Sequence, residues 1–364
     1  MKKYYILIAI FLATGINAFS QNKDSQNILE KLLWDDNMLN IMIDTRVDFE
    51  TDIIDNKTEE LSFRGQTLKI WIAGEIIPGI RYRVRHRLNR AQGSFPREGY
   101  SGATDHAWLA FDIRDKWTIT AGKQSVQLGT YEYDYNPADV YLPTMIFNDF
   151  DGYKAGVNVA YKFLGQAINL QLVNSDSPQF AADNFARKAL TINLLWEGSL
   201  FNEIVKTRWG YGAFQHNRDK FYNWLTLGTQ LNIGSFTAEL DYYLGERNID
   251  YNLSLNDEPL GSRFVQDQSA SVNLKYNLGK WRPFIKGVWS KRHDKDFKDD
   301  VYNISGIQAV VEYYPFTHPR VKDLRFHVMY GYNNTDYSSG MFSSLNNIDS
   351  HTLLIGTRWL FKAK

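Results

Sequence analysis

The sequence predicts an all-β fold, a transmembrane antiparallel β-barrel of sixteen strands with short periplasmic turns and long outer loops. Apolar and polar residues alternate over many segments of about ten residues, the length that a membrane strand needs. Short and long connections alternate along the chain, and aromatic residues are concentrated near the segment ends. The 364 residues include 22 Tyr, 22 Phe and 10 Trp but no Cys. Disulfide frameworks, thiolate metal clusters and cysteine nucleophiles are therefore excluded.

The chain opens with the three parts of an export signal. Two lysines precede the apolar run Tyr4–Ala13, and Ala18 and Ser20 form a small-x-small cleavage site. The apolar run is too short to span a bilayer. We therefore expect residues 1–20 to be a cleaved signal peptide, residues 21–38 a periplasmic N-terminal extension and residues 39–361 the barrel. The expected location is the outer membrane of a Gram-negative bacterium.

Alternation with a period of two marks the strands. Between Leu39 and Glu50, every second residue is apolar or Thr, and the residues between them are mostly polar or charged. This period places one set on the lipid side and the other in the lumen. The pattern recurs at residues 68–76, 153–163, 236–244, 270–278 and 324–332. These segments exceed the roughly 5 to 6 residues usual in soluble sheets and approach the roughly 9 to 11 of a tilted membrane strand.

The connections differ in length according to their parity. The tight ones are Ile77–Gly79, Arg114–Lys116, Leu164–Gln166, Ser199–Asn202, Gly234–Ser235 and Gly279–Lys280, with Pro315–Asp323 as a longer last member. The intervening ones are Asp55–Gly65, Ala91–Thr104, Val126–Asp151, Asn174–Ala186, Arg247–Asp267, Arg292–Tyr302 and Asn333–Asp349, with Asn217–Lys220 as a short exception. Outer-membrane barrels sort their loops in this way, whereas a soluble sandwich has no reason to do so.

Aromatic residues near the tight turns predict an interfacial girdle. Trp117, Trp196, Trp281 and Tyr313 all lie within a few residues of such a turn, where barrel aromatics meet the lipid headgroups. The last segment, Thr352–Phe361, ends on an aromatic residue and is similar to the closing strands that the barrel-assembly machinery recognises. We therefore expect outer-membrane lipid and that machinery among the partners.

The densest cationic feature is a run of arginines at alternating positions between residues 81 and 87. Each would cost about 2 to 4 kcal/mol facing lipid at the bilayer midplane, so all four should face the lumen. The pore-lining residues predicted for an anion path are Arg81, Arg83, Arg85, Arg87, Lys123 and Lys154. The alternative is a lumenal salt-bridge network with the acids of the first strands, Asp44, Asp48, Glu50 and Glu75. The sequence leaves both open.

The longest connection is the third outer loop of the predicted barrel, residues 127–151. It is too aromatic to favour disorder, and loops of this length usually have a function. We expect it to fold inward and constrict the pore. Its acids would oppose anion flow unless Lys123 or Lys154 compensates them. The constriction residues are Tyr131, Glu132, Tyr133, Asp134, Tyr135 and Asp139. The alternative is an exposed loop that packs on its neighbours.

Several stretches resemble the phosphate-selective porin O and P family, as found in Bacteroidetes. They are residues 117–124 (WTITAGKQ), 129–141, 153–161, 170–175 and 205–209. The resemblance implies a sixteen-stranded outer-membrane porin that is often trimeric. Acids on the predicted lumenal faces, together with a net charge of zero, leave phosphate preference open. A weaker similarity, at residues 122–124 and 150–153, is to alginate-export barrels.

The predicted function is passive diffusion of small hydrophilic solutes through a porin, with anions such as phosphate preferred and a homotrimer as the possible assembly. The alternative is a saccharide channel or binding barrel, with Trp71, Trp108, Tyr222, Trp224 and Tyr243 as stacking residues. An outer-membrane hydrolase is a further alternative, but the chain has neither a His-Glu-x-x-His nor a Gly-x-Ser-x-Gly motif. We predict no enzyme activity, cofactor or metal. The balance of 41 basic and 41 acidic residues argues against nucleic acid as a partner.

Overall fold

A computed structural model describes residues 38–91, 98–255, 258–319, 321–337, 340 and 342–363. The predicted signal peptide, residues 1–20, and residues 21–37 of the predicted extension lie outside the described residues. Among the described residues, no helix is both long enough and apolar enough to cross a membrane.

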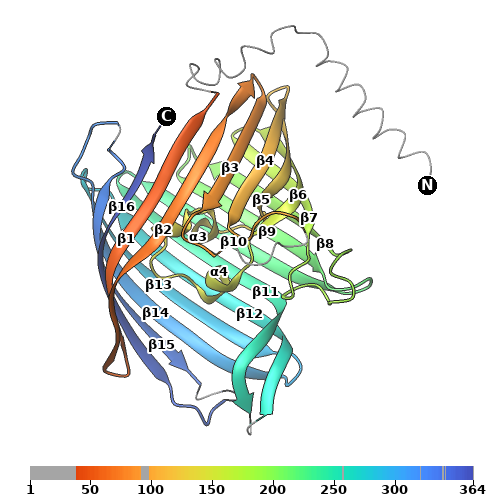
Figure 1. Cartoon of the computed structure of the whole chain (residues 1–364), viewed down its shortest axis with the longest axis vertical. Coiled ribbons are helices and arrows are strands. Elements are labelled where there is room, and N and C mark those ends of the chain that lie inside the picture. The colour runs from red at the N-terminus through yellow and green to blue at the C-terminus, as the bar shows by residue number, and fades with distance from the viewer. Residues whose placement is uncertain are drawn as a thin grey trace.

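Sixteen antiparallel strands form a closed barrel in which β1 pairs with β16 (Figure 1). The strands are β1 Asn40–Ile54, β2 Lys57–Ile77, β3 Ile80–Arg87, β4 Thr104–Ile113, β5 Trp117–Ser125, β6 Tyr153–Phe163, β7 Gln166–Asn174, β8 Leu190–Leu200, β9 Val205–Gln215, β10 Phe221–Ile233, β11 Phe236–Leu255, β12 Glu258–Tyr276, β13 Trp281–Asp294, β14 Asp299–Tyr313, β15 Arg325–Asp336 and β16 Ile348–Lys362. Three short helices, α3 Tyr131–Asp134, η1 Pro137–Asp139 and α4 Met145–Asp149, lie between β5 and β6. The predicted fold class is confirmed.

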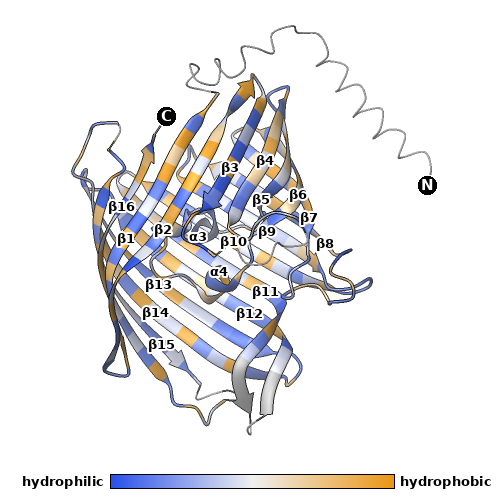
Figure 2. Cartoon of the chain, in the orientation of Figure 1, coloured by the Kyte–Doolittle hydropathy of each residue, from blue (hydrophilic) through white to orange (hydrophobic). Residues whose placement is uncertain are grey.

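Hydrophobic and hydrophilic residues alternate along the strands, as Figure 2 shows. In β7, for example, Leu170 is 54% exposed and the next residue, Gln171, is 0% exposed. The apolar set therefore covers the outside of the barrel, and the polar set fills the inside. This is the reverse of a soluble protein and matches a barrel that is surrounded by lipid.

The two ends of the barrel differ. At one end, which we call the short-turn end, the connections are residues 78–79, 114–116, 164–165, 201–204, 234–235, 277–280 and 314–324. They match the predicted tight turns, including the longer last one. At the other end, which we call the long-loop end, the connections between residues 88 and 103, 126 and 152, 175 and 189, and 337 and 347 are long.

Three of the predicted outer loops are wrong for most of their length, because they form strands. β1 reaches Ile54 and β2 starts at Lys57; β11 reaches Leu255 and β12 starts at Glu258; β13 reaches Asp294 and β14 starts at Asp299. Beyond the hydrocarbon layer, both faces of a strand meet water, so the contrast between apolar and polar positions fades. A prediction based on that contrast therefore assigns such a strand extension to a loop.

The aromatic girdle lies where the sequence predicts it, at the short-turn end. Ring pairs form between Trp117 and Tyr161 at 4.6 Å, between Trp281 and Tyr313 at 4.3 Å, and between Trp359 and Phe361 at 4.0 Å. Trp117 and Trp281 are nearly half exposed on the outer surface. Amphipathic rings at this height suit the interface between hydrocarbon and headgroups.

Candidate functional site

The connection between β5 and β6, residues 126–152, lies inside the barrel, and we call it the lumenal loop. Figure 1 places α3 and α4 of this loop within the ring of strands. Leu128 is 2% exposed and Ile146 is 0% exposed, because both pack in a hydrophobic cluster with residues of the barrel wall. The alternative of an exposed loop is excluded by this burial.

The start of the lumenal loop is fastened to β9, β10 and β11. The Asp241 carboxylate accepts hydrogen bonds from the backbone N–H groups of Tyr131 and Glu132, each at 2.8 Å. Thr130 Oγ1 donates to the Tyr243 hydroxyl at 2.7 Å. At Gly129 a Cβ would lie 2.5 Å from the backbone oxygen of Arg208. The loop backbone therefore rests directly on the wall backbone, and only glycine fits there.

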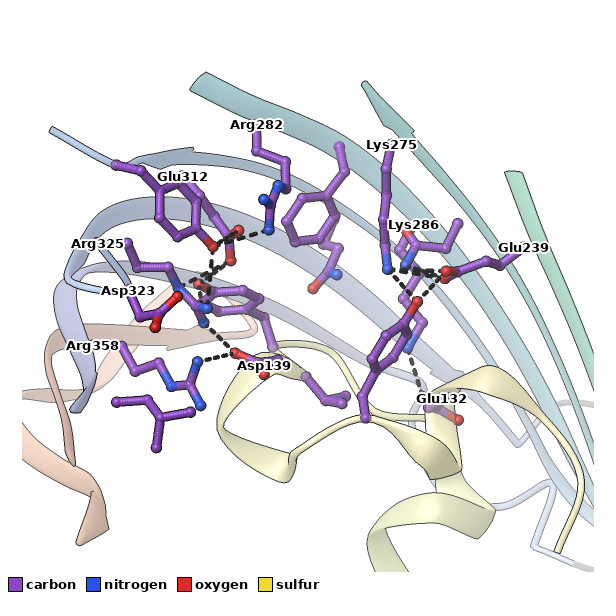
Figure 3. Close-up of a pocket in the computed structure, with 18 of the residues that line it drawn as sticks. Glu132, Asp139, Glu239, Lys275, Arg282, Lys286, Glu312, Asp323, Arg325 and Arg358 are labelled. Carbon is purple, nitrogen blue, oxygen red and sulfur yellow. Dashed lines mark hydrogen bonds and ion pairs between the residues drawn. The ribbon is translucent and has the colours of Figure 1, made fainter. Parts of the chain in front are cut away.

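Glu132 ties the middle of the lumenal loop to β13. The side chain is 3% exposed and accepts from Lys286 Nζ at 2.6 Å (Figure 3). The same carboxylate accepts from the backbone N–H of Thr144 at 2.9 Å, across the loop. Lys286 Nζ also donates to the Leu142 carbonyl at 2.7 Å. One buried ion pair thus fixes both the wall contact and the internal shape of the loop.

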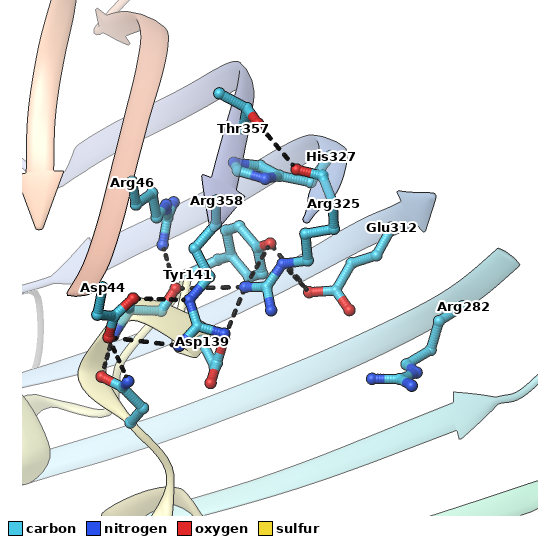
Figure 4. A network of polar contacts seen from close by, with 12 residues as sticks. Asp44, Arg46, Asp139, Tyr141, Arg282, Glu312, Arg325, His327, Thr357 and Arg358 are labelled. Atoms are coloured by element: carbon cyan, nitrogen blue, oxygen red, sulfur yellow. Dashed lines mark hydrogen bonds and ion pairs between the residues drawn. The ribbon is translucent and has the colours of Figure 1, made fainter. Parts of the chain in front are cut away.

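The far side of the lumenal loop docks on β15, β16 and β1 (Figure 4). The Asp139 carboxylate contacts Arg325 Nη2 at 2.7 Å and Arg358 Nη1 at 3.0 Å. The Ala138 carbonyl accepts from Arg46 Nη1 at 3.0 Å. Burial raises the pKa of Asp139, but the two guanidinium groups lower it by more, so the pKa lies below its ordinary value. The carboxylate is therefore charged at neutral pH.

Arg46, Arg358 and Arg325, which we call the arginine row, are direct register neighbours on β1, β16 and β15. Like charges facing each other across a sheet repel. Each arginine of the row therefore has its own acid on the wall: Arg46 contacts Asp48 at 2.7 Å, Arg358 contacts Asp44 at 3.0 Å and Arg325 contacts Glu312 at 3.2 Å. Asp139 adds a fourth carboxylate when the loop docks.

Two cavities lie on opposite sides of the docked loop. The inner cavity, at the short-turn end, has a volume of about 530 Å³, and the outer cavity, at the long-loop end, about 450 Å³. Val140 and Tyr141 line both. The segment that follows Asp139 is therefore the partition between them.

The two cavities differ in charge. The inner cavity is lined by six basic residues (Lys275, Arg282, Lys286, Lys322, Arg325, Arg358) and six acidic ones (Glu132, Asp139, Glu239, Asp241, Glu312, Asp323). The outer cavity is lined by five basic residues (Arg46, Arg64, Lys69, Arg87, Arg90) and one acidic residue, Glu50. The excess of positive side chains is therefore confined to the outer cavity.

Three of the four predicted arginines of β3 form ion pairs, but not with the acids of the first strands. Arg81 contacts Asp112 at 2.8 Å, and Asp105 contacts both Arg85 at 2.9 Å and Arg87 at 2.8 Å. Both acids belong to β4, which lies next to β3 in the barrel, so the pairing is local.

Arg83 is placed differently from its neighbours on β3. Its guanidinium carbon lies 5.5 Å from the centre of the Trp71 ring and 5.6 Å from that of Trp108. Among the described residues, no carboxylate lies within ion-pair distance of it. Its positive charge is thus held between two indole rings and left without a counter-charge.

Lys123 and Lys154 do not compensate Glu132, Asp134 or Asp139 of the lumenal loop. Lys123 contacts Glu98 at 3.5 Å, and Lys154 contacts Asp176 at 2.9 Å and Asp151, at the very end of the loop, at 2.8 Å. Glu132 pairs with Lys286, Asp134 with Arg208 at 3.1 Å, and Asp139 with the arginine row. The compensating cations come from strands that are distant in sequence.

The tyrosines of the predicted constriction do not share one role. Tyr131 is buried, and the Tyr133 hydroxyl donates to the Gly152 carbonyl at 2.9 Å, within the loop. The Tyr135 hydroxyl donates to Glu239 and accepts from Lys275 Nζ at 2.8 Å, at the wall of the inner cavity. Tyr141, which the sequence did not single out, lies between the cavities with Arg46 above its ring at 4.3 Å.

Three aromatic residues of the saccharide alternative are unavailable for stacking. Tyr222, Trp224 and Tyr243 are at most 1% exposed and belong to one hydrophobic cluster. Phe150, from the lumenal loop, packs against Trp224 at 5.0 Å. These aromatic residues hold the loop instead of presenting faces to a solute.

A family model matches residues 38–361, described as phosphate-selective porin O and P. The chain belongs to the phosphate-selective porin O and P family. This porin is thus an outer-membrane channel for small hydrophilic solutes. No curated protein sequence matches it.

Solved structures share the fold at low sequence identity. A loop-deletion mutant of OmpT, an outer membrane protein of Vibrio cholerae, is 14% identical, with a TM-score of 0.59, 89% of this chain covered and 99% of that chain. The outer membrane channel DcaP of Acinetobacter baumannii is 10% identical, with a TM-score of 0.59. The match covers 89% of this chain and 97% of that chain. An anion-selective porin from Comamonas acidovorans is 8% identical, with a TM-score of 0.58. The match covers 89% of this chain and 99% of that chain. At these identities the likeness concerns the fold alone.

Proposed function

We propose that this porin passes small anions in preference to cations, and that the lining of the outer cavity sets this preference. The observation that supports the proposal is the ratio of five basic side chains to one acidic side chain around that cavity. Fixed charge of one sign in a narrow, water-filled space raises the local concentration of ions of the opposite sign. Phosphate is one such anion.

Two of the five basic residues have no carboxylate within ion-pair distance in the part of the chain that the structure describes. Lys69 is 2% exposed, and its Nζ lies 3.1 Å from Asn136 Oδ1, an amide oxygen. Arg90 is exposed in the connection after β3. The other three, Arg46, Arg64 and Arg87, pair with acids. Lys69 and Arg90 therefore supply the positive potential that attracts anions.

The path continues past the loop along the arginine row. A guanidinium group offers several N–H donors to an oxyanion, and neighbouring sites of similar energy let an ion step onward without becoming trapped. On the other side of the partition, Arg282 and Lys322 line the inner cavity. Of the arginines predicted on β3, Arg83 keeps an unpaired charge, and we assign Arg81, Arg85, Lys123 and Lys154 a structural part.

The test is the reversal potential of single channels in a planar bilayer under a KCl gradient. The variant Lys69→Gln with Arg90→Gln should lose most of the anion preference, since a unit charge about 4 Å from an ion in water contributes about 1 kcal/mol. Lys116→Gln, at an exposed short turn, is the matched control and should leave the reversal potential unchanged. A wild-type channel that prefers cations would overturn the proposal.

We also propose a homotrimer, matured by cleavage after residue 20 and inserted by the barrel-assembly machinery. A solved structure of OmpT of Vibrio cholerae, which shares the fold, is described as a trimer form. Analytical ultracentrifugation in detergent should give three copies per particle, and N-terminal sequencing of the membrane-extracted protein should begin at Gln21. A monomer or an intact Met1 would contradict the corresponding part.

A further inference from the structure

Only part of the lining of the outer cavity is open to a solute. The apolar side chains of Met329 and Leu354 are 2% and 3% exposed and pack with Tyr141 of the lumenal loop, so they offer no surface. Outside the lumenal loop, the lining residues that are not buried are all polar. On the barrel side of this cavity, a solute therefore meets only polar groups.

The accessible polar residues differ in charge from one side of the cavity to the other. Three arginines, Arg64, Arg87 and Arg90, come from β2, β3 and the connection after β3. Arg90 is exposed, and the Arg64 side chain is 42% exposed. Asn333 and Thr352 come from β15 and β16, on the other side of β1. One side thus presents accessible positive charge, and the opposite side presents neutral hydrogen-bonding groups.

The neutral groups keep oxygens that can accept further hydrogen bonds. Thr352 Oγ1 donates to Asp52 at 2.6 Å, and Gln66 Nε2 donates to Glu50 at 2.7 Å, which leaves the lone pairs of Thr352 Oγ1 and the amide oxygen of Gln66 available. Among the described residues, the Asn333 amide has no hydrogen-bond partner, and it lines the cavity. Hydroxyl groups of a solute suit these oxygens. An aliphatic body would displace water from them without replacing its hydrogen bonds, which costs affinity.

The outer cavity is large for an inorganic anion. Its volume of about 450 Å³ is many times the roughly 30 Å³ that one water molecule occupies in the liquid. Chloride or phosphate held by the arginines on one side leaves Asn333 and Thr352 on the other side to water. A molecule of the size of a sugar can reach both sides at once.

We infer that the solutes of this porin are hydroxylated organic anions, in which a carboxylate or phosphate group is attached to a body with several hydroxyl groups. The anionic group lies at Arg64 and Arg90. The hydroxyl groups exchange hydrogen bonds with Asn333, Thr352 and Gln66. This inference rests on the proposed anion preference and narrows it to a solute class.

The test uses sodium gluconate and sodium hexanoate as blockers of the single-channel chloride current. The two carboxylates have the same charge and the same number of carbon atoms, and they differ in their hydroxyl groups. The half-blocking concentration of gluconate should be about fivefold lower than that of hexanoate, which corresponds to roughly one net hydrogen bond. A bilayer without channels controls for partitioning of hexanoate into lipid.

Two variants separate the neutral side from the cationic side. In Asn333→Leu with Thr352→Val, which keeps every charge, the difference between gluconate and hexanoate should largely disappear, while the reversal potential under a KCl gradient stays the same. In Arg90→Gln, both carboxylates should block more weakly by the same factor, and their difference should remain. Asn277→Leu, at an exposed short turn, is the matched control and should behave as the wild type.

The two proposals fail in different ways. A channel that prefers anions by reversal potential, yet is blocked by hexanoate as strongly as by gluconate, overturns the solute class and leaves the anion preference standing. A channel without anion preference overturns the proposed function itself. If the double variant does not fold, Asn333→Leu alone replaces it and should reduce the difference. A difference that survives unchanged overturns the assignment to this side of the cavity.

Discussion

Arg46 on β1 and Arg358 on β16 are direct neighbours across the seam at which the barrel closes. Two guanidinium groups at such a position repel each other unless acids intervene. Asp48 and Asp44 pair with them on the wall, and Asp139 reaches Arg358 from the lumenal loop. These ion pairs thus connect the seam, the arginine row and the loop segment that partitions the lumen.

Replacing Asp139 by Asn should loosen the far side of the lumenal loop. The amide cannot neutralise Arg325 and Arg358, so the loop loses its two ion pairs with the row. We expect larger and noisier single-channel currents than in the wild type. Asp323→Asn is the control, because Asp323 lines the same cavity but is exposed and has no ion pair among the described residues. Equal noise in both variants would show that Asp139 does not hold the loop.

The same contact predicts an acid dependence. The pKa of Asp139 in the folded porin lies below its ordinary value. The stabilisation is therefore complete above the ordinary value of about 3.9 and is lost as the pH falls through the folded pKa. Current noise should be constant from neutral pH down to about pH 4 and rise only below it. In Asp139→Asn the noise should be high throughout and lack this step, and a wild-type rise near neutral pH would contradict the assignment.

The Glu132–Lys286 ion pair should contribute more to the free energy of unfolding than a surface ion pair does. In Glu132→Gln the buried ammonium of Lys286 loses its counter-charge, which costs about 3 to 5 kcal/mol in buried pairs. The temperature at which the barrel loses its compact form on a denaturing gel should fall. The double variant Glu132→Gln with Lys286→Met removes the buried charge as well and should recover part of the loss. No recovery would mean that the pair is not coupled.

Gly129→Ala should displace the start of the lumenal loop. The added Cβ would lie 2.5 Å from the Arg208 carbonyl oxygen and 2.6 Å from that of Thr226, both fixed in the barrel wall. We expect faster cleavage of the loop by an added protease, with the barrel itself intact. Gly65→Ala is the control, since nothing lies within 4 Å of a Cβ there. Resistance of Gly129→Ala to the protease would contradict the close approach.

The fold could be predicted because, in each strand separately, apolar residues that face lipid alternate with polar residues that face the lumen. Alternation in residues such as Leu170 and Gln171 depends only on which side faces hydrocarbon, so neighbouring residues reveal it. The strand ends at Ile54 and Lys57 could not be predicted, because beyond the membrane both faces of a strand meet water and the alternation fades. The extra length of β1 and β2 is stabilised by the backbone pairing of the two strands.

The site was harder to predict because it depends on which residues meet across the lumen. Arg81, Arg83, Arg85 and Arg87 stand out as a run, but two carboxylates of β4 neutralise half of their charge. The arginine row comes from three strands, one near the start of the chain and two near its end, so no local pattern marks it. Closure of an even-stranded barrel places β1 beside β16, but the register that aligns Arg46 with Arg358 depends on the whole ring.

The docking surface of the lumenal loop also dictates an order of events during biogenesis. Ala138 and Asp139 contact Arg46, Arg325 and Arg358, which come together only when the first strand meets the last two. Before that moment Arg325 and Arg358 can already hold Asp139, but the hydrogen bond from Arg46 to the Ala138 carbonyl is missing. The lumenal loop therefore gains its full set of contacts on this side only after the barrel has closed.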